Sequence, residues 1–242
     1  MEKEKILGFD VCNIEQEELI QNIYNDYKNN NQSIILSVNP EIILNNYKND
    51  EYINWVNSQK YQIPDGIGII YASKFNGGNI KKRITGIDLM NEICMTSVNY
   101  NSKIFLYGAK PEVAEDTKKQ LEKKYIGINI VGVCDGYISE EKAIENIKKV
   151  NPDILFIGLG SPKQEKFILN NKSKLKSVKI LMPVGGSFDV ISNNLKRAPK
   201  WIIKINLEWL YRLIKQPKRI FRQVKLLKFI FLCINNKRKR RE

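Results

Sequence analysis

Asp65 is the carboxylate that this sequence presents most clearly for chemistry. It stands in the stretch Ile63–Gly68, between apolar runs at 61–63 and 67–71. Pro64 fixes the backbone angle φ and Gly66 frees it, so the pattern predicts that Asp65 lies at a loop tip and not along a helix face. The structural alternative is an Asp that only caps the helix beginning near Gly66.

The chain has no histidine, which limits the side chains that could act as a catalytic base together with or instead of Asp65. Ser-His-Asp and Cys-His systems and most catalytic zinc sites need an imidazole, so any base here is a carboxylate, Tyr, Lys or Cys. The four cysteines are scattered without C-x-x-C spacing, which predicts reduced thiols in a reducing compartment. The charged start Met1–Lys5 precedes no apolar core of a signal peptide. The apolar run Phe229–Ile234 is too short to span a bilayer.

Positive charge is concentrated in the last fifth of the chain. The net charge is +14, and residues 196–242 hold 16 Lys+Arg against two Asp+Glu, whereas the first 195 residues carry equal numbers of each sign. A chain of 242 residues that is 43% hydrophobic and 27% charged can bury a sizeable core. We therefore predict a neutral domain, residues 1–195, followed by a basic appendage, residues 196–242.

The appendage alternates aromatic and aliphatic residues with Lys and Arg at helical spacing, with one break at Gln216–Pro217. This pattern predicts basic amphipathic helices, which lie well in an anionic membrane interface. The cluster Lys237–Arg241 adds about 1 kcal/mol of attraction per cation near such a surface. Nucleic-acid binding is the alternative function, and a solvated helix face without a binding function is the structural alternative. Because the apolar side is as developed as the basic side, we favour the membrane.

Short apolar strands alternate with amphipathic helices through the second half of the chain. We predict strands at 103–107, 128–133, 153–157 and 178–184, and helices at 111–125, 139–150 and 162–170. Upstream we predict helices at 15–27, 41–48, 50–58 and 67–75, a strand at 34–38, and a helix reaching Ser97 that begins with a Thr85–Asp88 capping box. The alternation predicts an α/β fold with a Rossmann-like, mostly parallel sheet flanked by helices.

Turns of small or polar residues follow the predicted strands, at 107–109, 134–137, 158–161 and 185–187. Ligands of open α/β sheets bind at these carboxyl ends, so the four turns outline a nucleotide crevice. Neither G-x-G-x-x-G nor G-x-x-x-x-G-K-[ST] occurs, so dinucleotide and P-loop interpretations gain no support.

Gln164 is a candidate ligand because it lies where a glycine-rich turn meets a helix N-terminus. The stretch Gly158–Glu165 therefore favours an anion such as a pyrophosphate. The structural alternative is a capping box completed by Ser161, Pro162 and Gln164.

Three other residues each have a functional and a structural interpretation. Tyr137 can stack on a base or pack in the core. Asp189 can accept a hydrogen bond from a ribose hydroxyl or favour the first turn of a helix. Arg83 can pair with a phosphate or lie along the surface. No D-x-D occurs in the chain, so Arg, Lys and helix N-termini would have to meet the charge of a leaving diphosphate.

The ordered motifs of the chain resemble the WecG/TagA/CpsF family of glycosyltransferases. They are Ser37–Glu41, Pro64–Gly66, Arg83–Asp88, Gly158–Glu165, Val184–Asp189 and Arg197–Pro199. The resemblance covers nearly the whole chain and is nearest to the TagA branch, the N-acetylmannosaminyltransferases of wall teichoic acid synthesis. It implies transfer of ManNAc from UDP-ManNAc to GlcNAc on undecaprenyl diphosphate, by a peripheral protein at the cytoplasmic face of the plasma membrane.

The resemblance also implies roles for individual residues. Asp65 would be the general base, and Arg83 a second catalytic residue. Substrate contacts would fall on Ser37, where relatives commonly have Thr, on Asn39 and Gln164, and, for uridine, on Gly136, Tyr137 and Asp189. Basic residues of the appendage would complete the site at the membrane, at Arg212, Arg219 and Arg222. No cofactor and no metal are expected, because the UDP-sugar is a substrate.

Two alternatives stay open at this point. The same scaffold can use another UDP-sugar for capsule or exopolysaccharide, or the chain can be a non-enzymatic, nucleotide-regulated basic binding module. The main interpretation has a UDP-sugar donor, a polyprenyl-diphosphate-linked sugar acceptor and an anionic membrane surface as partners, without nucleic acid, and it leaves a homo-oligomer open. A single inverting displacement needs one base and no covalent nucleophile, which suits a chain without histidine.

Overall fold

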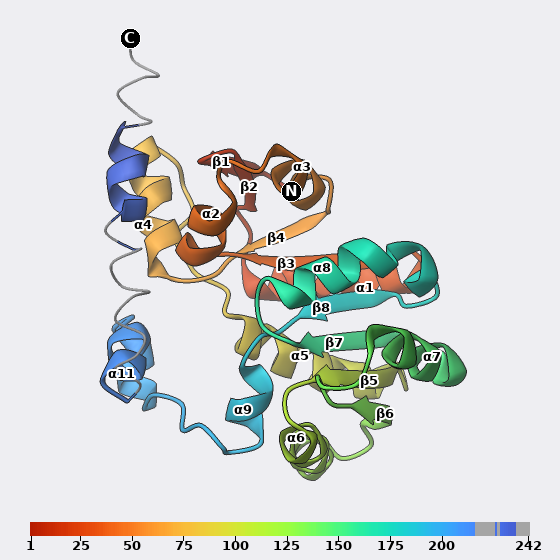
Figure 1. Ribbon diagram of the computed structural model, residues 1–242. Coiled ribbons are helices and arrows are strands. Elements are labelled where there is room, and N and C mark those ends of the chain that lie inside the picture. The colour runs from red at the N-terminus through yellow and green to blue at the C-terminus, as the bar shows by residue number, and fades with distance from the viewer. Residues whose placement is uncertain (216–225, 227, 236–242) are drawn as a thin grey trace.

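Six parallel strands form the central sheet of the protein, seen in a computed structural model that describes residues 1–215, 226 and 228–235 (Figure 1). The strands are β3 (Ser33–Val38), β4 (Tyr61–Pro64), β5 (Lys103–Gly108), β6 (Asn129–Cys134), β7 (Ile154–Gly158) and β8 (Ile180–Pro183). They lie in the order β4-β3-β8-β7-β5-β6, and every pairing is parallel. All six carboxyl ends therefore face one edge, and the predicted α/β class is confirmed.

Helices cover both faces of the sheet (Figure 1). The first layer contains α2 (Pro40–Asn46), α3 (Asp50–Asn57), α4 (Ile67–Asn76), α7 (Glu140–Val150) and α8 (Lys163–Asn171), which continues as a 3-10 turn, Lys172–Leu175. The second contains α1 (Gln16–Lys28), α5 (Gly86–Asn99), α6 (Pro111–Lys124) and α9 (Ser187–Ile191).

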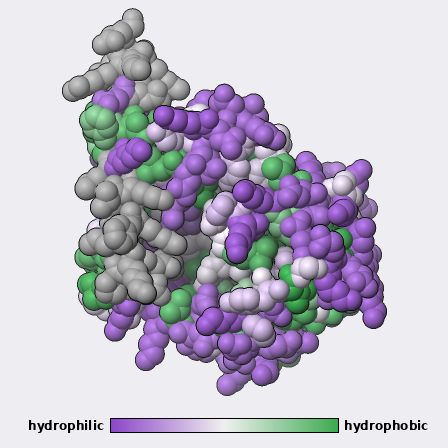
Figure 2. Space-filling model, viewed as in Figure 1, coloured by the Kyte–Doolittle hydropathy of each residue, from purple (hydrophilic) through white to green (hydrophobic). Residues whose placement is uncertain are grey.

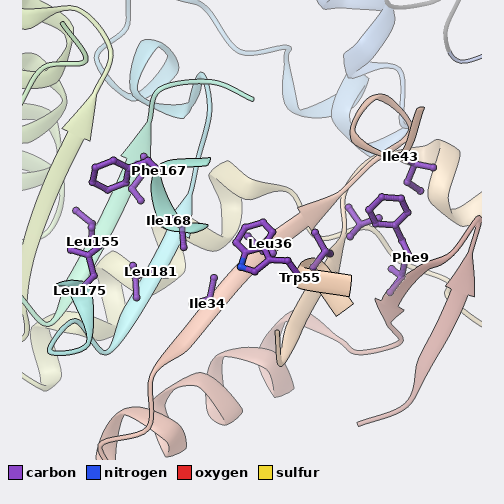
Figure 3. Close-up of a cluster of buried hydrophobic side chains, with 14 of the residues drawn as sticks. Phe9, Ile34, Leu36, Ile43, Trp55, Leu155, Phe167, Ile168, Leu175 and Leu181 are labelled. Atoms are coloured by element: carbon purple, nitrogen blue, oxygen red, sulfur yellow. The ribbon is translucent and has the colours of Figure 1, made fainter. Parts of the chain in front are cut away.

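The strands supply side chains to both layers in alternation. On β3, Ile34 and Leu36 belong to the first layer and Ile35 belongs to the second. Figure 3 shows the first layer, which runs from Phe167 on α8 across the sheet to Phe9 near the N-terminus. A sheet buried on both faces needs apolar residues at consecutive positions, which explains the short apolar runs of the sequence.

An N-terminal hairpin and the edge strand β4 are parts of the fold that were not predicted as strands; residues 61–63 were predicted only as an apolar run before the Asp65 turn. Strands β1 (Lys3–Ile6) and β2 (Phe9–Cys12) pair antiparallel as a separate two-stranded sheet. Leu7 and Gly8 connect them, both with positive φ. Such a turn usually carries Asn-Gly or Asp-Gly, and Leu-Gly gives only a weak signal.

The other predicted elements are confirmed with bounds that differ by a few residues. Thr85 caps α5 as predicted: its hydroxyl oxygen accepts from the Asp88 backbone N–H at 3.3 Å and donates to the Asp88 carboxylate at 2.6 Å. All four cysteines are buried and free, as expected of reduced thiols.

The described part of the appendage is helical, as predicted. It contains α10 (Lys200–Lys204), α11 (Glu208–Lys215) and the helical residues 228–235. Phe229 and Cys233 are fully buried within the first layer, and residues 228–235 lie beside α4 (Figure 1). The division of the chain at residue 195 stays a prediction. Within the described residues, no helix is long and apolar enough to cross a membrane.

Candidate active site

The carboxyl ends of the strands form a continuous rim held together by backbone hydrogen bonds. The rim consists of Asn39, Asp65, Ala109, Asp135–Tyr137, Leu159–Gln164 and Gly185–Ser187. The Gly136 N–H donates to Ala109 at 2.8 Å, and the Ala109 N–H donates to Gly158 at 2.9 Å. A Cβ on Gly108 would lie only 2.4 Å from the backbone of Gly158, so glycine lets β5 and β7 approach here.

Asp65 lies where β4 ends and α4 begins. It is half-buried, and its backbone N–H donates to the Val38 carbonyl at the end of β3 at 2.9 Å. The N-cap position of α4 is occupied by Gly66, with φ of +94°, a conformation that favours glycine. The loop-tip position predicted for Asp65 is therefore what the structure shows, and the residue at the cap is its neighbour.

Asn39 and Ser37 reach the same end of the rim from the adjacent strand. Asn39 caps α2, and its Oδ1 accepts from the Ile42 N–H at 2.9 Å. Ser37 is paired in register with Ile63, two residues before Asp65. A Cβ on Gly86, the first residue of α5, would lie 3.7 Å from the Ser37 hydroxyl. Both side chains therefore lie beside helix N-termini, where a negatively charged ligand is favoured.

Arg83 belongs to the same end of the rim. The Ile84 N–H donates to the carbonyl of Pro64 at 2.8 Å, which ties the Arg83 segment to the residue before Asp65. The Arg83 side chain is only 16% exposed, and its Nη2 lies 3.5 Å from both the Glu208 carboxylate and the Ile203 carbonyl. The surface alternative for Arg83 is wrong, because the start of the appendage covers its guanidinium.

An ionic network connects this corner to the appendage. Arg197 donates two hydrogen bonds to Asp88, at 2.5 and 2.7 Å, and its Nε lies 3.5 Å from Glu208. Burial alone would raise the pKa of Asp88, but the hydrogen bonds from Arg197 and Thr85 outweigh it and lower that pKa below its ordinary value. Sequence reasoning assigned no role to Asp88 beyond capping and none to Arg197 or Glu208.

Gln164 spans two turns of the rim. Its Oε1 accepts from the Gly185 N–H and its Nε2 donates to the Glu165 carboxylate, both at 2.9 Å. The capping-box alternative is wrong, because α8 begins at Lys163 with Pro162 at its N-cap, and the Gln164 amide turns to Gly185 instead of to the cap. Burial raises the pKa of Glu165, although the hydrogen bond from Gln164 opposes this.

The residues expected to contact uridine lie farther along the rim. Tyr137 is 75% exposed, so the packed alternative is wrong, and its N–H donates to Asp135 at 2.8 Å. Asp189 lies in the first turn of α9, as its structural alternative proposed. Asp65 and Tyr137 follow opposite edge strands, five strand spacings or roughly 24 Å apart. Gln164 and Asp189 follow strands between them, so the candidate residues line an elongated rim.

The predicted tail arginines are described only in part. Arg212 belongs to α11, whose first residue is Glu208, but its side chain is not described, and Arg219 and Arg222 lie outside the described residues. A hollow of about 240 Å³ adjoins Arg83 and is lined by Ile67, Ile70, Lys81, Lys82 and Asn206. A larger one, about 500 Å³, lies between α5, α6 and α9 on the second face. We place the chemistry at the smaller one because it adjoins the Asp65 end of the rim.

A parallel α/β sheet with charged and polar residues along its carboxyl rim is typical of proteins that bind ligands such as nucleotides at that edge. Residues 4–242 match the Glycosyl transferase WecG/TagA/CpsF family. The chain belongs to that family and is a glycosyltransferase, which confirms the resemblance found in the sequence.

Its relatives include three proteins named N-acetylglucosaminyldiphosphoundecaprenol N-acetyl-beta-D-mannosaminyltransferase. The protein of Bacillus subtilis (strain 168) is 36% identical over 86% of this chain and 82% of its own. That of Bacillus spizizenii is 31% identical over 98% and 93%. That of Staphylococcus aureus (strain MW2) is 35% identical over 98% and 94%.

Proposed function

We propose that the protein transfers N-acetylmannosamine from UDP-ManNAc to GlcNAc-diphospho-undecaprenol, in wall teichoic acid or related surface polysaccharide synthesis. Three relatives that align with most of the chain carry the name of this transfer. The observation that carries the proposal is the joining of Asp65 and Arg83 at one corner through the hydrogen bond from the Ile84 N–H to the Pro64 carbonyl, 2.8 Å.

The chemistry that this corner supports is a single displacement. The acceptor hydroxyl oxygen forms a bond to the anomeric carbon while the bond from that carbon to the UDP oxygen breaks. Asp65 takes the hydroxyl proton, and the electron pair leaves with UDP. Arg83 and the nearby helix N-termini meet the charge that develops on the diphosphate without a metal. The exposed ring of Tyr137 stacks on the uracil at the far end of the rim.

A donor panel tests this function. The full-length protein is incubated with vesicles that contain a GlcNAc-diphospholipid and with UDP-ManNAc, UDP-GlcNAc, UDP-glucose or UDP-galactose, and released UDP is measured. We expect acceptor-dependent UDP release that is greatest with UDP-ManNAc. Faster release with another donor would assign the scaffold to a different polysaccharide. No acceptor-dependent release with any donor would favour the binding-module alternative.

We also infer that the protein docks on the cytoplasmic face of the membrane. Exposed apolar side chains occur along the appendage, at Trp201, Ile205, Trp209, Leu210, Ile214, Phe231 and Ile234. They continue onto α4, where Tyr71 is 52% and Phe75 44% exposed. Figure 2 shows apolar surface along this side of the molecule, near α11 and near the helix beside α4. Lysines accompany these residues, as an anionic interface requires.

Substitutions on α4 test whether the lipid-facing surface extends beyond the appendage. We expect the double change Tyr71→Ser and Phe75→Ser to weaken binding to anionic vesicles about tenfold or more, since two partly buried aromatic rings leave the interface. Ile126→Ser is the matched control, because Ile126 is 89% exposed and lies between α6 and β6. Strand β6 forms the edge of the sheet opposite to β4, which precedes α4. Cosedimentation measures both. Unchanged vesicle binding by the α4 variant would restrict the membrane contact to the appendage.

A further inference from the structure

Glu208 is the only acidic residue between positions 196 and 241, in the most basic part of the chain. It begins α11, and its side chain is only 5% exposed. A carboxylate is rarely buried to this extent unless cations or hydrogen-bond donors surround it. The burial of Glu208 therefore indicates that its carboxylate is paired with nearby cations.

Glu208 lies between two arginines that come from different parts of the chain. Its Oε2 is 3.5 Å from Nη2 of Arg83, and its Oε1 is 3.5 Å from Nε of Arg197. Both distances are long for hydrogen bonds, so the attraction is mainly between charges. Arg197 is in turn fastened to Asp88 by two short hydrogen bonds. Negative and positive groups thus alternate from α5 through the appendage to Arg83.

A neutral side chain at position 208 would be unfavourable. Without the carboxylate, the guanidinium groups of Arg83 and Arg197 would face each other across the same partly buried space and repel. Arg83 would then turn toward solvent and away from the corner that holds Asp65.

We propose that Glu208 is a positioning residue, which holds the Arg83 guanidinium at the Asp65 corner when the appendage is docked. This inference rests on the proposed role of Arg83 toward the substrate diphosphate. The contact joins the first residue of α11 to the segment between α4 and α5.

A double-mutant cycle tests the proposal in the full-length protein with lipid acceptor vesicles. The variants are Glu208→Gln, Arg83→Gln and both together, and kcat and the donor KM are measured for each. We expect Glu208→Gln to lower kcat/KM about tenfold when Arg83 is present and to have little further effect in the Arg83→Gln background. Glu145→Gln is the matched control: it removes an exposed carboxylate on α7 that pairs with Lys142 at 3.0 Å, away from the Asp65 corner, and should leave kcat/KM unchanged.

The outcomes distinguish failure of the role proposed for Glu208 from failure of the proposed function. Effects that add fully in the double variant would overturn the positioning role and leave the proposed function intact. An Arg83→Gln protein with wild-type kcat/KM would overturn both the role of Arg83 in the proposed function and the inference built on it. If Glu208→Gln does not fold, Glu208→Asp, which keeps the charge and shortens the side chain, should give a smaller loss that again disappears with Arg83→Gln.

Discussion

Replacing Asp65 with Asn should lower kcat for sugar transfer by about 10²–10⁴-fold while donor binding changes little. The amide has the same shape but cannot accept the proton of the acceptor hydroxyl. The backbone hydrogen bond that places the residue, from its N–H to the Val38 carbonyl, does not involve the side chain. Transfer is measured as UDP release with the lipid acceptor, and donor binding by calorimetry.

Asp116→Asn is the control for this change. Asp116 lies on α6 with its side chain 45% exposed and pairs with Lys119 at the surface, so its loss should not alter transfer. An Asp65→Asn protein that binds donor and retains near-full transfer would refute the assignment of Asp65 as the base.

Among the substitutions proposed for this protein, Phe229→Ala should lower the free energy of unfolding most. Phe229 is fully buried in the first layer although it belongs to the appendage. Truncating a buried Phe costs about 3–5 kcal/mol, which for a chain of this size corresponds to a fall in Tm on the order of 10 °C. Thermal unfolding followed by circular dichroism measures it.

Phe231, two residues farther along the same helix, provides the matched control. It is 62% exposed, so Phe231→Ala should change the free energy of unfolding by less than about 0.5 kcal/mol. Equal Tm values for the two variants would show that residues 228–235 do not pack on the core in solution. In that case the appendage would not be anchored beside α4.

Five of the six strands of the sheet, all except β4, could be predicted because their signals are local. The apolar runs of β5 and β7 and the Thr85–Asp88 capping box depend only on neighbouring residues. The hairpin was missed because Leu7-Gly8 is not a strong turn signal. The capping box proposed for Gln164 was wrong because its amide bonds to Gly185, 21 residues away, a contact that no local pattern predicts.

The same distinction applies to the candidate site. Asn39 could be placed at a strand end, and Asp65 in a turn after an apolar run, because a helix start follows each of them closely. Glu208 and Arg197 gain their importance from contacts with Arg83 and Asp88, more than 100 residues away. One signal in the sequence could have indicated Glu208, namely its position as a lone acid within a strongly basic segment.

The central claim is that the corner at Asp65 performs one inverting displacement of ManNAc onto the lipid-linked sugar. The most direct measurement is NMR of the lipid product formed from UDP-ManNAc by the full-length protein, together with the amount of UDP released. We predict one ManNAc added per UDP, with its anomeric configuration inverted relative to the donor. A product with retained configuration, or UDP released without glycosylated lipid, would contradict the claim.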